Sequence, residues 1–81
     1  MSESRRALVL HLAGGGEPIW IAVPADSADK LNDDLPKLLL ADAPQPITCA
    51  DGSSVVVNFT HVAAALITTM PSLGSVYGNR R

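Results

Sequence analysis

Residues 7–23, ALVLHLAGGGEPIWIAV, decide the fold class, because they hold two apolar segments on either side of a glycine-rich loop. In residues 7–12, leucines alternate with other side chains, and this period of two is that of a β-strand. Residues 18–23 alternate in the same way. The loop Gly14–Gly16 adopts positive φ at low cost. The segment therefore predicts an antiparallel hairpin.

Both faces of this hairpin carry apolar side chains. Ile19, Ile21 and Val23 share one face of the second strand, whereas Trp20 and Ala22 share the other. A single sheet covered by one helix layer buries only one face. The second face must therefore meet a barrel interior, another sheet or a partner chain, and we weight barrel closure and a subunit contact equally.

Residues 26–41 predict a helix that is interrupted by proline. Asp26 or Ser27 is suited to cap its start. Pro36 removes one backbone hydrogen bond and costs about 3 kcal/mol in a helix interior. We therefore expect a kinked helix or two pieces, about 26–34 and about 36–41. The apolar stripe of this helix consists of Ala28, Leu31, Leu35 and Leu38.

Residues 47–59 predict a second hairpin, with strands over 47–50 and 53–59. Between them, Asp51-Gly52 is typical of a two-residue type I′ turn. A turn of that length sets the register of the two strands. The expected pairs across the ladder are Ile47 with Val56 and Thr48 with Val55.

The end of the chain predicts one more strand after a break at residues 58–61. Alanines at 63–65 favour a short helix over 62–68, but Ile67 and the threonines after it favour a strand, which we choose. The fold class is thus α+β. We expect a small β-β-α-β-β(-β) domain in which antiparallel hairpins pack with one kinked helix, and a small, partly open barrel is a variant of it. Residues 6–71 form this single domain, between a flexible N-terminus (1–5) and a flexible or docking C-terminal tail (72–81).

One part of this pattern resembles a known architecture. The order of the last elements resembles the closing part of SH3-like and Sm-like small barrels. These elements are a strand, an Asp-Gly turn, a strand, the break at 58–61 and a last strand. The likeness covers about twenty residues. The chain departs from the Sm pattern by placing its helix between the second and third strands, and it lacks a basic surface that would face RNA.

The residues that most often carry catalysis show no spacing that requires it. His11, Cys49 and His61 are far apart in the sequence, and a lone cysteine on a strand is most simply a small buried residue. The loop Gly14–Gly16 lacks the lysine and hydroxyl of a phosphate-binding loop. The aspartates between 26 and 34 lack the glycine and glutamate of a calcium loop. We therefore assign no catalytic, cofactor-binding or metal-binding residues, and we expect a protein that is not an enzyme and has no cofactor.

Charge is distributed unevenly along the chain, whose net charge is −2. Four of the six basic residues lie near the ends, and the body between them is acidic, so it repels phosphate backbones. With one cysteine and no stretch of about 20 apolar residues, we expect a cytoplasmic protein without a membrane partner. The terminal arginines are Arg5, Arg6, Arg80 and Arg81.

Two functions fit these observations. The first is a non-enzymatic protein-interaction or regulatory module that self-associates, with a dimer favoured, through an apolar strand or helix surface; another protein of unknown identity is the further partner. The second is a nucleic-acid-binding accessory protein that uses the four terminal arginines as basic arms around a small barrel, and the acidic body argues against it. The interface candidates for the first function are Trp20, Val9, Leu73 and Tyr77.

Overall fold

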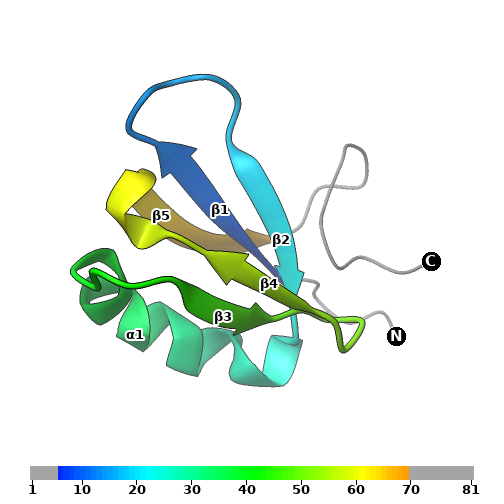
Figure 1. The fold of residues 1–81 in the computed structure, drawn as a ribbon. Coiled ribbons are helices and arrows are strands. Elements are labelled where there is room, and N and C mark those ends of the chain that lie inside the picture. Colours follow the sequence, from blue (N-terminus) through cyan, green and yellow to red (C-terminus); the bar gives the residue numbers. More distant parts are fainter. Residues whose placement is uncertain (1–5, 70–81) are drawn as a thin grey trace.

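The computed structural model describes residues 6–69, which form two antiparallel sheets and one helix (Figure 1). The larger sheet has the strand order β2-β1-β5, and the smaller sheet pairs β3 with β4. These findings confirm the predicted small α+β domain, in which the described strands do not close into a barrel. The predictions for residues 1–5 and 72–81 lie outside the described residues. The elements are β1 (Arg6–Leu12), β2 (Ile19–Val23), η1 (Ala25–Ser27), α1 (Ala28–Leu39), β3 (Gln45–Thr48), β4 (Ser54–Val57), η2 (Phe59–His61) and β5 (Val62–Thr69).

The first hairpin forms as the alternation of apolar residues predicts. Strands β1 and β2 are antiparallel, with Leu8 opposite Ile21 and Leu10 opposite Ile19. The connecting loop uses positive φ at Gly15 and Gly16, which glycine adopts without steric cost. One face of the hairpin therefore supplies the core with a continuous apolar layer.

Strand β5 pairs with the other side of β1, so β1 is the central strand of the larger sheet. Residues 62–69 are a strand throughout, as predicted, and do not form the alternative helix. Val9 lies opposite Leu66 in this ladder, and the register shifts between His11 and Leu12. The ladder decides the conformation, because a strand here satisfies the second hydrogen-bonding edge of β1.

Of the two expected forms, a kinked helix or two pieces, helix α1 contradicts the two-piece form. A single helix runs through Pro36, which lies in its last turns and is exposed to solvent. The carbonyl of Asn32, which loses its amide partner to the proline, belongs to an exposed residue, so water can solvate it. Ser27 occupies the N-cap position without a side-chain capping bond, and its hydroxyl instead lies 3.4 Å from the carbonyl oxygen of Pro24.

The predicted apolar stripe of α1 faces the core. Ala28 and Leu35 are buried, while Leu31 and Leu38 are half-buried and pack against the buried cluster. The core thus lies between the larger sheet, the helix and the smaller sheet. Its buried members are Leu8, Leu10, Ile21, Val23, Ala28, Leu35, Ile47, Cys49, Val57, Phe59 and Val62.

The second hairpin forms, but the predicted turn and register are wrong. Ile47 lies opposite Val55 and Thr48 opposite Ser54, a shift of one residue from the expected pairs. The amide of Cys49 donates to the carbonyl of Ser53 at 2.8 Å, which leaves a loop of three residues. Since only Gly52 has positive φ, at 88°, the turn is not type I′, which needs positive φ at the preceding residue too.

The side chain of Asp51 supports this longer loop. Its Oδ1 accepts hydrogen bonds from the amide of Ser53 at 2.9 Å and from the hydroxyl of the same residue at 2.5 Å. The resulting register places Val55 and Val57 on the face of Ile47, toward the core, and leaves Val56 65% exposed. The loop therefore decides which valines are buried.

We predict that Gly52→Ala destabilises the domain by about 1–2 kcal/mol, because a side chain at positive φ meets the following carbonyl. Urea unfolding followed by tryptophan fluorescence measures the change. Gly14→Ala is the matched control, since Gly14 has open space around it and ordinary φ. The control leaves stability unchanged or raises it by up to about 1 kcal/mol. Equal effects of the two substitutions would contradict the observed turn.

Candidate protein-interaction surface

The single turn η2 carries the chain from the smaller sheet to the larger one. Asn58 precedes it, and its Oδ1 accepts hydrogen bonds from the amide of Thr60 at 3.2 Å and the hydroxyl of the same residue at 2.6 Å. Phe59 points into the core and is 1% exposed. Residues 58–61 were predicted as a break or tight turn, and this turn confirms it. Asn58 and Phe59 therefore fix the turn that leads from β4 into β5.

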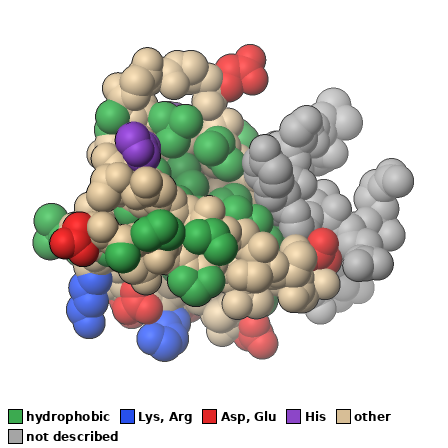
Figure 2. Space-filling view, in the orientation of Figure 1, with side chains coloured by type: hydrophobic (Ala, Val, Ile, Leu, Met, Phe, Trp, Pro, Cys, Tyr) green, Lys and Arg blue, Asp and Glu red, His purple; other side chains and the backbone are tan. Residues whose placement is uncertain are grey.

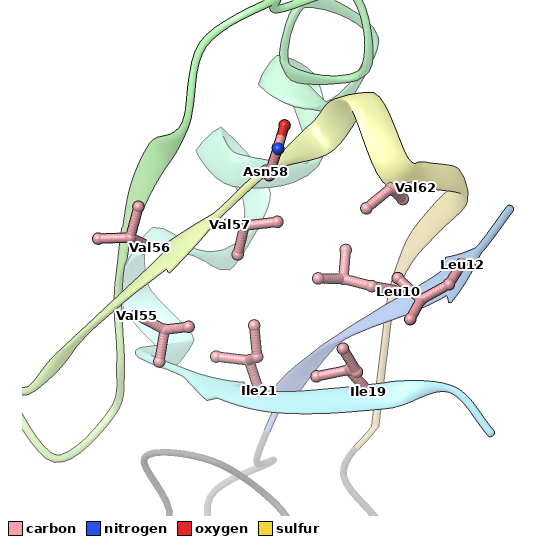
Figure 3. A pocket seen from close by; sticks show the side chains of 9 residues that line it. All are labelled: Leu10, Leu12, Ile19, Ile21, Val55, Val56, Val57, Asn58 and Val62. Atoms are coloured by element: carbon pink, nitrogen blue, oxygen red, sulfur yellow. The ribbon is translucent and has the colours of Figure 1, made fainter. Parts of the chain in front are cut away.

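An apolar cleft of about 310 Å³ opens between β2 and β4 (Figure 3). Ile19 and Ile21 enter it from β2, Val57 enters it from β4, and the side chain of Val56 points away from it. Asn58 is the only polar residue in its lining. The complete lining is Leu10, Leu12, Ile19, Ile21, Val55, Val56, Val57, Asn58 and Val62.

One hydrogen bond closes the cleft at one end and reveals the orientation of the β2 backbone. The amide of Ala50 donates to the carbonyl of Ala22 at 2.8 Å, so the backbone of Ala22 faces away from β1. Backbone groups alternate in direction along a strand, so those of Trp20 face the same way. The amide and carbonyl of Trp20 have no hydrogen-bond partner within residues 6–69. They therefore form a free strand edge beside the cleft.

The second strand edge belongs to β4. Because the amide of Cys49 bonds to Ser53, the backbone groups of Val55 and Val57 face β3, and those of Val56 face outward. No hydrogen bond joins the outward groups of Val56 to another described residue. Pro46 of β3 lies opposite Val56, at a position where the backbone groups face away from the partner strand, so its lack of an amide hydrogen removes no hydrogen bond between β3 and β4. The cleft thus lies between two strands that each have an unpaired position.

The predicted interface residues that the structure describes lie on the other face of the larger sheet. Trp20, Val9 and Leu66 form one row across its three strands. Val9 is only 3% exposed and offers little area to a partner, Trp20 is half-buried and Leu66 is 40% exposed. Sequence reasoning missed Leu66, which only the β1–β5 register places beside Val9. Leu73 and Tyr77 lie outside the described residues.

Charged side chains lie mainly at the margin of the face in Figure 2, where apolar side chains gather over the sheets. Residues 6–69 contain seven acidic side chains and three basic ones. One of the basic residues, Lys30, forms an exposed ion pair with Asp34 at 3.3 Å. Of the predicted terminal arginines the structure describes only Arg6, which is half-exposed in β1. Arg5, Arg80 and Arg81 lie outside the described part of the chain.

The histidines and the cysteine do not converge on a reactive centre. His11 and His61 are exposed, whereas Cys49 is 1% exposed and its thiol lies 3.9 Å from the carbonyl oxygen of Ile47. Among residues 6–69, no three His, Cys, Asp or Glu side chains gather into a group that could hold a metal ion. Cys49 is thus a small core residue, as expected from its place on an apolar segment.

Comparison with known proteins gives no relative: no family model, curated protein or solved structure matches this chain. The helix in the described part of the chain is too short and too polar to cross a membrane. The functional argument therefore rests on the cleft, the strand edges beside it and the exposed apolar residues.

We predict that the thiol of Cys49 reacts with a disulfide reagent at least about 100-fold more slowly in the native chain than in urea, because labelling requires local opening. Absorbance of the released thiolate gives the rate directly, since the chain has one cysteine. The double variant Cys49→Ala/Ala50→Cys moves the thiol to the neighbouring exposed position and should react nearly as fast as the unfolded chain. Rapid native labelling of Cys49 itself would contradict its burial.

Proposed function

We propose that this protein is a non-enzymatic interaction module that self-associates through its apolar strand surface. The observation that carries the proposal is the open cleft between β2 and β4, where core side chains such as Ile19 and Ile21 border two unpaired strand edges. Exposed strand edges with adjacent apolar surface are sites where another chain pairs. A partner bound in the cleft would cover its apolar side chains and would also form hydrogen bonds with the unpaired backbone groups of the two strand edges.

The size of the domain supports the same proposal. A chain of 81 residues buries only about 60% of the surface that its unfolded form exposes, and it gains from burying more in an assembly. Trp20 is the second residue of β2, the strand whose edge is free, and it is half-buried in the single chain. Tryptophan supplies large contact areas at interfaces. Because its side chain lies on the face of the larger sheet away from the cleft, we assign Trp20 a second contact of the associated state, outside the cleft itself.

The polar side chains support a role without catalysis. Every charged or polar side chain in residues 6–69 is at least partly exposed, and the buried set is entirely apolar. Catalytic groups usually need partial burial and close neighbours that tune their reactivity. The absence of such a cluster in this region leaves recognition by apolar surface as the function that the described residues favour.

The test is the solution mass of the full chain by light scattering over the micromolar range. We expect twice the chain mass of 8.5 kDa for the native sequence, and a shift toward the monomer at equal concentration for Ile19→Ala, which shortens a half-buried side chain of the cleft lining. Leu40→Ala is the control, since Leu40 is 85% exposed at the end of α1 and does not line the cleft. This variant should keep the native mass. A monomeric native chain at all concentrations would refute self-association.

A further inference from the structure

The cleft has the chemistry of a site for one extended strand. The outward backbone groups of Trp20 and Val56 offer hydrogen bonds from either side, and the floor between them is apolar. A strand placed there presents its backbone to both edges and every second side chain to the floor. The fitting segment therefore has large apolar residues at alternate positions.

Residues 72–77 of this chain, SLGSVY, match that pattern at two of three alternate positions. In extended form, Leu73, Ser75 and Tyr77 share one face, so two large apolar groups flank a small one. Arg80 and Arg81 follow without any acidic residue in 70–81, whereas acidic side chains outnumber basic ones by seven to three in 6–69. Opposite charge thus favours contact between this segment and the folded body.

We propose that the cleft of one copy binds residues 72–77 of a second copy as an inserted strand. The exchange is reciprocal and gives a closed two-fold dimer, in which each copy fills the cleft of the other. This inference rests on the proposed self-association and names the segment that produces it. Leu73 and Tyr77 contact the apolar floor, and the basic residues after them approach the acidic body.

The length of the chain after β5 favours insertion into the cleft of a second copy over insertion into the same copy. Thr69 lies level with Arg6 and Val23, and the cleft lies beyond β1 and β2, about three strand spacings or 14 Å away. The Ala50–Ala22 hydrogen bond closes the near end, which adds about 7 Å along β2. The direct distance is thus about 16 Å, close to the span of about 14 Å from Thr69 to the Cα of Leu73 in a fully extended chain, so insertion into the same copy needs an almost straight connection.

The first experiment changes the inserted segment in the full chain. Leu73→Ser/Tyr77→Ser removes both apolar groups from the face that meets the cleft, and light scattering should then give the monomer mass. Val76→Ser is the matched control, because Val76 belongs to the opposite face of an extended segment. It should keep the mass of the native dimer.

The second experiment changes the cleft. Val55→Thr adds a hydroxyl to its half-buried lining and should raise the dimer dissociation constant at least about fivefold. Leu40→Thr introduces a hydroxyl on a side chain that is 85% exposed and does not line the cleft, so the dissociation constant should stay the same. Thermal unfolding of both variants confirms that each remains folded.

The third experiment restores the segment in trans. A fluorescein-labelled peptide of residues 70–81 should bind the full-length Leu73→Ser/Tyr77→Ser variant, and its fluorescence anisotropy should rise. The binding should weaken in high salt. The peptide should bind less tightly to the same variant carrying Val55→Thr. A native dimer whose mass survives Leu73→Ser/Tyr77→Ser overturns strand exchange and leaves self-association standing. A monomeric native chain overturns both, even if the peptide binds the variant.

Discussion

The pairing of β1 on both of its edges is the constraint on which the rest of the structure depends. Strand β2 follows β1 closely in sequence, whereas β5 is separated from β2 by residues 24–61, which contain the helix and the second hairpin. Leu8 and Leu10, at the centre of these ladders, are at most 1% exposed. Because β1 is satisfied on both sides, the unpaired edge beside the cleft falls on β2.

Two links hold the smaller sheet against the larger one, and the cleft lies between them. At one end, the amide of Ala50 bonds to the carbonyl of Ala22; at the other, η2 turns the chain directly from β4 into β5. Between these links the strands β2 and β4 diverge, so apolar side chains from both sheets border open space. The cleft is therefore a consequence of how two small sheets are joined without closing into a barrel.

The proposed assembly follows from an imbalance between apolar surface and chain length. The described residues bury a core made entirely of apolar side chains, yet leave Trp20 half-buried and the cleft lined by isoleucine and valine. A second copy that contributes a strand covers the cleft and pairs the free backbone groups beside it in one step. The described strands form two separate sheets and no closed barrel, so the SH3-like and Sm-like resemblance of the sequence carries no functional weight.

The sequence by itself determined the elements whose signals are local. The period of two in residues 7–12 and 18–23 predicted the first hairpin, and the apolar stripe from Ala28 to Leu38 predicted the buried face of α1, because both patterns depend on neighbouring residues alone.

Tertiary structure decided the register of the second hairpin. Asp51-Gly52 suits loops of two or three residues, and the longer loop is the one that turns Val55 and Val57 toward the core, where the predicted register would have turned Ser54 and Val56. It likewise decided that residues 62–69 are a strand, that Pro36 stays within one helix and that Leu66 lies beside Val9, because each outcome depends on partners distant in the sequence.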